Sequence, residues 1–114
     1  MAAIREWQLL RWVREFRGYT QADVSAAVKQ LGGRLSLDHL SRLERGEKIA
    51  PSYQTVQAWL EVLEVPMGAL DVVRSAPMSE TELREFASGF VFQGLSQLSD
   101  RELRQLVSER YGAQ

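Results

Sequence analysis

The chain has 114 residues, 45% of them hydrophobic, and a formal net charge of −1, which suits one compact domain or one small domain with an appendage. It has neither an apolar run near the roughly 18 residues of a membrane span nor a basic, apolar leader, so we expect no membrane partner and a cytoplasmic location. The absence of cysteine excludes disulfides and thiolate metal sites.

Charge is distributed unevenly along the sequence. Residues 1–50 hold nine Lys and Arg against six Asp and Glu, whereas residues 51–114 hold five against nine. A basic half followed by an acidic half is typical of a nucleic-acid reader with a separate association segment. An asymmetry of this size also arises by chance, so charge alone leaves both interpretations open.

Apolar residues recur at three- and four-residue steps through the first part of the chain, which predicts helices and no strand. Glycine, proline and hydroxyl residues mark where these helices begin and end. The predicted helices are, in chain order, residues 4–17, the stretch from the cap Thr20 to the Gly32–Gly33 break, the stretch from Ser36 to Gly46, residues 53–63 and residues 67–73.

The third of these helices has two faces of different chemistry. Leu40 and Leu43 fall together on a side that suits a core. The opposite side suits a partner. It holds Leu37, Asp38, Ser41, Arg42 and Arg45. Ser36 is a good N-cap for this helix, and Gly46 ends it because glycine takes the left-handed conformation without steric cost.

A boundary is predicted at residues 75–78, between a domain of residues 1–75 and a C-terminal helical segment of residues 79–114. Two helices are predicted in that segment, each opened by an S-x-x-E capping box. The boxes are Ser79 with Glu82 and Ser99 with Glu102. Apolar surface that stays exposed on two helices is usually buried against a second copy of the chain, so we expect a symmetric dimer. The expected contact residues are Phe86, Phe90, Phe92, Leu95, Leu103 and Leu106. The alternative is a hairpin that folds back on the first domain.

Several short signatures follow one another in the first domain. They are Leu10, Arg11, Val13, Arg14, Arg17 to Gln21, Ser36, Leu40 to Gly46, Pro51, Ser52, Thr55, Val56 and Leu63. In this order they resemble the Cro and CI-repressor (XRE-type) helix-turn-helix domain over about residues 5–73. The resemblance implies an all-α fold, a five-helix lambda-repressor-like domain with a C-terminal two-helix extension. The stretch from Thr20 to Ser36 is longer than is usual in the family, so helix two runs on or the turn bulges at residues 32–34.

The resemblance also implies that the third helix lies in the major groove of double-stranded DNA. It places Leu37, Asp38, Ser41 and Arg42 at base-reading positions, where Arg42 suits guanine, Asp38 cytosine and Leu37 a thymine methyl. Candidates for phosphate contacts are Gln21, Arg34, Ser36, Arg45 and Lys48. Arg14 and Glu44 match the family's internal ion pair. The alternative for Asp38 and Arg42 is an ion pair on a solvated face, and the alternative for Ser36 is a plain helix cap.

The residues needed for common enzyme chemistry are missing. His39 is the only histidine and there is no glycine-rich phosphate loop, so we expect no enzyme, no metal and no cofactor. The leading hypothesis is a sequence-specific DNA-binding transcriptional regulator, a dimeric repressor. One alternative is an antitoxin-type regulator that binds a toxin through residues 79–114. Another is a protein-interaction module that exposes Trp7, Trp12 and Phe92.

Overall fold

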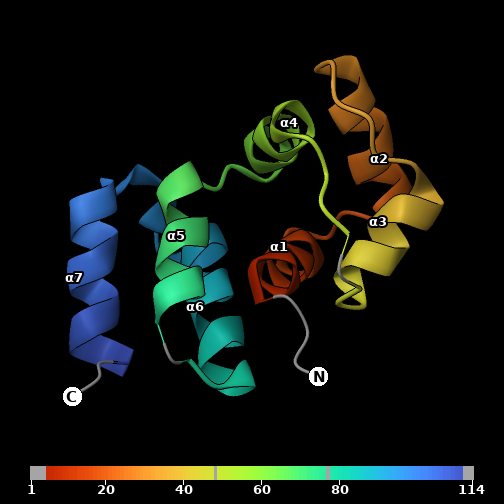
Figure 1. The fold of residues 1–114 in the computed structure, drawn as a ribbon. Coiled ribbons are helices and arrows are strands. Elements are labelled where there is room, and N and C mark those ends of the chain that lie inside the picture. The colour runs from red at the N-terminus through yellow and green to blue at the C-terminus, as the bar shows by residue number, and fades with distance from the viewer. Residues whose placement is uncertain (1–4, 48, 77, 112–114) are drawn as a thin grey trace.

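A computed structural model describes residues 5–47, 49–76 and 78–111. Over these residues the chain forms seven α-helices, one 3₁₀ helix and no strand (Figure 1), which confirms the predicted all-α fold. The elements are α1 (Arg5–Phe16), α2 (Gln21–Gln30), α3 (Leu37–Glu44), α4 (Tyr53–Leu63), α5 (Met67–Ser75), α6 (Glu80–Phe92), η1 (Leu95–Gln97) and α7 (Asp100–Tyr111). None of the described helices has the length and the apolar character that crossing a membrane requires.

Helices α2, α6 and α7 begin where the sequence provides a hydroxyl cap and an acidic side chain. At α2, Oγ1 of Thr20 accepts from the N–H of Asp23, and the Asp23 carboxylate accepts from the N–H of Thr20. The boxes predicted at the starts of α6 and α7 form with the same reciprocal bonds. Each box satisfies two backbone donors that have no partner within their helix, so these helix starts are determined locally.

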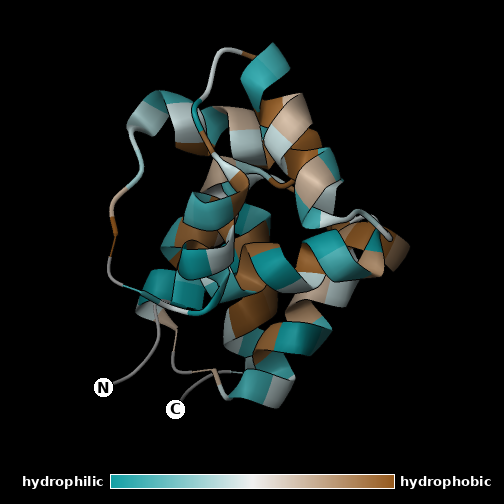
Figure 2. Cartoon of the chain, turned by 90° about the vertical axis from the view of Figure 1, so that its right-hand side faces the viewer, coloured by the Kyte–Doolittle hydropathy of each residue, from teal (hydrophilic) through white to brown (hydrophobic). Residues whose placement is uncertain are grey.

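α1 lies at the centre of the molecule, between α2 and α3 on one side and α5 to α7 on the other (Figure 1). Its apolar residues Leu9, Leu10 and Val13 are fully buried. Trp7 stacks on Trp59 of α4, with ring centroids 5.4 Å apart and an interplanar angle of 19°. Trp7 therefore belongs to the core and is not exposed as the protein-interaction alternative requires. Along the helices, hydrophobic and hydrophilic residues alternate (Figure 2), as expected where one side of each helix is buried.

The C-terminal helices pack on the rest of the chain. α6 lies against α1, where the guanidinium of Arg84 covers the ring of Trp12 at 4.5 Å from its centroid, and α7 lies against α5. Arg17 follows α1 and donates from Nε to the carbonyl of Leu63 at 2.7 Å and from Nη2 to that of Phe90 at 3.1 Å. Buried residues of both predicted segments form one hydrophobic core.

This packing corrects most of the predicted dimer contact. Four of the six expected residues are buried within one chain, at most 6% exposed, and offer little surface to a second copy. They are Phe86, Phe90, Leu95 and Leu103. The physical reason is that α1 and α5 already cover the apolar faces of α6 and α7. Leu106 is partly buried against the same core, whereas Phe92 is 68% exposed, with Phe16 edge-on beside it at a centroid distance of 6.1 Å.

The long connection between α2 and α3 is a wide turn of residues 31–36. Its backbone is tied to α4, because the N–H of Arg34 donates to Oγ1 of Thr55 at 3.0 Å. Gly33 lies so close to α2 that a Cβ there would be 2.6 Å from the side chain of Val28, a contact that only glycine avoids. Of the two alternatives that the sequence left open, a longer helix or a bulged turn, the structure ends α2 at Gln30 and places residues 31–36 in the turn. The contacts of this turn with α2 and α4 hold the start of α3.

Candidate nucleic-acid interface

α3 turns one side to the core and the other to solvent. Leu40 and Leu43 are fully buried, as the helical period predicted. On the other side Leu37 is 50% exposed, and Asp38 and Arg42 are exposed as well. No other described part of the chain covers these three side chains, so this face is accessible to a partner.

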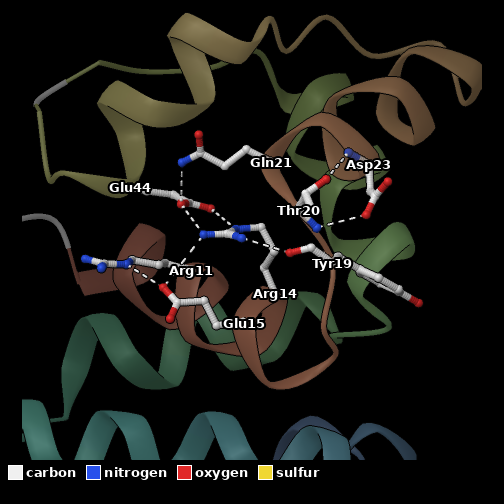
Figure 3. A network of polar contacts seen from close by, with 8 residues as sticks. All are labelled: Arg11, Arg14, Glu15, Tyr19, Thr20, Gln21, Asp23 and Glu44. Atoms are coloured by element: carbon white, nitrogen blue, oxygen red, sulfur yellow. Dashed lines mark hydrogen bonds and ion pairs between the residues drawn. The ribbon is translucent and has the colours of Figure 1, made fainter.

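Glu44, at the end of α3, fixes the roll of the helix through a buried cluster (Figure 3). Its Oε2 accepts from Nε of Arg14 at 2.7 Å, and its Oε1 accepts from Nη2 of Arg14 and from Nε2 of Gln21, both at 2.9 Å. Nη1 of Arg14 donates to the carbonyl of Tyr19 at 2.8 Å. Because a two-pronged arginine–carboxylate pair compensates the burial of both charges, the cluster joins α1, α2 and α3 firmly. The Arg14–Glu44 pair that the resemblance implied is present.

Gln21 therefore has a partner within the protein that its sequence position did not indicate. A small surface hollow of about 160 Å³ lies beside this cluster. It is lined by Arg11, Arg14, Gln21, Ser41, Glu44 and Arg45. Each of its three arginines is paired with a carboxylate, Arg14 with Glu44, Arg11 with Glu15 and Arg45 with Glu47.

The other predicted phosphate contacts have different surroundings. Oγ of Ser36 accepts from the N–H of His39 at 3.1 Å, so this residue is the helix cap that the alternative interpretation proposed. Arg34 is exposed on the wide turn, and Arg45 is exposed at the end of α3. Lys48 lies outside the described residues.

The chain reverses direction at the end of α3 in a Schellman motif. Gly46 has a φ of 87°, and its N–H donates to the carbonyl of Leu43 at 2.9 Å. The N–H of Glu47 donates to the carbonyl of Arg42 at 3.1 Å. These two bonds satisfy carbonyls that have no partner within the helix, and they bring Glu47 back beside the last turn.

Sequence reasoning missed the contacts that Glu47 makes there. Its Oε1 accepts from Nε of Arg42 at 2.9 Å, and its Oε2 accepts from Nη2 of Arg45 at 3.2 Å. The hydrogen bonds from Arg42 and Arg45 lower the pKa of the Glu47 carboxyl. Arg42 thus pairs with Glu47 and not with Asp38, contrary to the solvated pair considered from the sequence. The signal that could have indicated this contact is the Gly46–Glu47 step directly after a helix with arginines in its last turn.

One comparison with known proteins identifies the family. The family described as Helix-turn-helix matches residues 10–70, more than half of the chain, including α2 to α4 and the Arg14–Glu44 pair. No curated protein and no solved structure matches the chain. The chain therefore belongs to the XRE-type (Cro and CI-repressor) helix-turn-helix family of DNA-binding transcription regulators.

Proposed function

We propose that this regulator is a repressor that binds a pseudo-palindromic DNA site as a dimer, with α3 of each copy in the major groove. The observation that carries the proposal is the division of α3 into a fixed inner side and an exposed outer side. Glu44 fixes the roll of the helix, and Asp38 and Arg42 are exposed. On such a site the two recognition helices would lie about 34 Å apart, one turn of DNA. A regulator of this kind would act in the cytoplasm, where we expect the chain to be.

Each outward residue has a chemical preference among the bases. The two terminal nitrogens of Arg42 suit O6 and N7 of guanine, the Asp38 carboxylate suits the N4 amino group of cytosine, and Leu37 suits a thymine methyl. The hydroxyl of Ser41 accepts from Nη1 of Arg45 at 2.8 Å and keeps its own proton to donate. Phosphate contacts are proposed for Arg34, Arg45 and Lys48, whereas Gln21 is bonded to Glu44 and Ser36 caps α3.

The dimer contact requires surface that the monomer core does not use. Of the six residues expected from the sequence, Phe92 has this property, since its ring is 68% exposed. Sedimentation over a range of concentrations would test the assignment. The native chain should dimerise, and Phe92→Ser should weaken that association. A monomer at the concentrations that bind DNA would contradict a preformed dimer.

The rival functions have less support. The sequence favoured a protein-interaction module through the weak net charge and exposed aromatic residues. Of these aromatics Phe92 is exposed, whereas Trp7 is buried against Trp59. An antitoxin would have to bind its toxin on the outer sides of α6 and α7, because their inner sides pack on α1 and α5.

Selection of bound sites from random DNA, followed by a salt series on the selected duplex, tests the proposal. We expect two symmetric half-sites and an affinity that falls with a logarithmic slope of roughly −0.9 per phosphate contacted. Arg42→Ala should lose about 1–3 kcal/mol of base discrimination, whereas Arg104→Ala, on the exposed side of α7, should keep it. No enrichment of any sequence, together with binding that ignores salt, would reject the proposal.

A further inference from the structure

Glu47 has a position between the two arginines at the end of the recognition helix. One carboxylate oxygen is bonded to Arg42 and the other to Arg45, at 2.9 and 3.2 Å. Arg45 is also held from its other terminal nitrogen by the hydroxyl of Ser41 at 2.8 Å. One acidic side chain with no assigned role therefore links two residues with proposed DNA contacts, Arg42 and Arg45, and Arg45 in turn bonds a third, Ser41.

The bond to Arg42 uses Nε and not the end of the guanidinium. Among the residues that the structure describes, the two terminal nitrogens of Arg42 make no hydrogen bond. Those two nitrogens form the fork that matches O6 and N7 of guanine. Glu47 can thus hold Arg42 from behind while the fork contacts a base.

Glu47 is itself held in place by the backbone. The Schellman motif at Gly46 fixes the N–H of Glu47 to the carbonyl of Arg42, so the carboxylate reaches the arginines from a defined position. The two arginine hydrogen bonds lower the pKa of this carboxyl, because they favour its charged form. A fixed negative charge beside Arg42 and Arg45 also weakens their attraction to phosphates in general.

We propose that Glu47 is a positioning residue for DNA specificity, which orients Arg42 toward a guanine and reduces binding to random DNA. This inference rests on the proposed function, because it concerns the same DNA interface. The proposed function does not imply this role for Glu47, since a chain could bind DNA through α3 while Glu47 remains an ordinary solvated side chain.

Glu47→Gln removes the charge and keeps the shape, and Glu109→Gln is its matched control. Glu109 is exposed on α7, across the molecule from α3, and accepts from Nε2 of Gln105 at 3.2 Å (Figure 1). Affinity is measured for the selected duplex and for a random duplex of equal length, at several salt concentrations. We expect Glu47→Gln to bind random DNA more tightly and to lose about tenfold of its preference for the selected duplex, as expected when one arginine–guanine contact is loosened. If the preference changes no more than in Glu109→Gln, the inference is wrong.

Repeating the random-DNA selection with the variants separates positioning from a structural role. The native chain should require guanine at one position of each half-site, and Glu47→Gln should relax that position alone. Glu47→Asp keeps the charge on a shorter side chain, so it should relax the same position without the same gain in random binding. Equal sequence preferences in the native chain and both variants would overturn the inference and leave the proposed function intact. A native chain that selects no sequence would instead overturn the proposed function.

Discussion

Glu44 and Glu47 lie at the same end of α3 and both bind arginine, yet the side chain of Glu44 is 4% exposed and that of Glu47 is 39% exposed. Glu44 receives three hydrogen bonds inside the protein and joins three helices. Glu47 bonds arginines that are themselves exposed. Water replaces a lost partner at the surface but not in the interior. The comparison teaches that burial, rather than the presence of an ion pair, decides whether an acidic residue supports the fold or is available for function.

The variant with the largest expected effect on stability removes the buried carboxylate of Glu44. Glu44→Ala removes the buried carboxylate of Arg14, which keeps a carboxylate only in the longer 3.7 Å pair with Glu15. It should lower the free energy of unfolding by about 3–5 kcal/mol, the usual cost of breaking a buried pair from one side. Urea denaturation monitored by circular dichroism measures it. The control is Asp38→Ala on the exposed side of α3, where loss of one charge in the first turn should cost less than about 1 kcal/mol. Equal unfolding midpoints for the two variants would refute the comparison.

Arg17 tests whether burial also decides for hydrogen bonds to neutral groups, because it donates to two carbonyl groups and not to carboxylates. It donates to Leu63 at the end of α4 and to Phe90 in α6. Arg17→Ala should cost about 2 kcal/mol, since two partly buried carbonyls lose a charged donor. Arg11→Ala, on the exposed side of α1, removes a surface pair with Glu15 and should cost less than about 1 kcal/mol. If the urea midpoints showed Arg11→Ala to be as costly as Arg17→Ala, burial would not be the deciding property.

The helices and their starts could be predicted from sequence because they depend on neighbours along the chain. Apolar spacing and capping residues act within one or two turns. The partner of an apolar face is not local. The pattern that contains Phe86 and Leu103 indicates that α6 and α7 bury one side, and it does not say whether α1, α5 or a second copy covers that side. This is why the dimer contact was assigned to residues that the monomer buries.

The two sides of the recognition helix α3 could also be predicted from local spacing in the sequence. The contacts of Glu47, which follows this helix, could not. The exposed and buried sides of α3 follow from the helical period, and Leu40 and Asp38 lie where it puts them. The contact of Glu47 with Arg42 depends on how the chain reverses at Gly46. The amide of Gln21 bonds Glu44 across two helices, which no spacing in the sequence indicates.

A smaller test concerns the reversal that brings Glu47 beside the arginines. α4 ends in the same motif as α3, with Glu64 at a φ of 57° in the place of Gly46 and the N–H of Val65 bonded to the carbonyl of Leu60 at 3.0 Å. Gly46→Ala should therefore destabilise the protein by about 1 kcal/mol, and Glu64→Gly should stabilise it by up to about 1 kcal/mol, because a Cβ is strained at positive φ. Thermal unfolding of the two variants measures both effects. Shifts of the same sign would contradict the shared motif.

The smallest expected effect comes from a contact of intermediate burial, between α7 and α6. The hydroxyl of Tyr111 donates to Oε1 of Glu85 at 2.8 Å, and burial, with this bond, raises the pKa of Tyr111 from 10.0 to about 12. Tyr111→Phe should cost about 0.5–1 kcal/mol at neutral pH, the net value of one hydrogen bond. The free energy of unfolding at neutral pH, compared with that of Tyr53→Phe at an exposed tyrosine, measures this cost.

The raised pKa also gives the cost of Tyr111→Phe a definite pH dependence. Because the folded state holds the phenolic proton more tightly than the unfolded state, the contribution of Tyr111 is complete below pH 10 and is lost as the pH rises to about 12. The difference in unfolding free energy between the native chain and Tyr111→Phe should therefore shrink over this range. A difference for Tyr111→Phe that is constant with pH would show that the folded state does not raise the pKa of Tyr111, and would group this contact with the exposed ion pairs of Glu47.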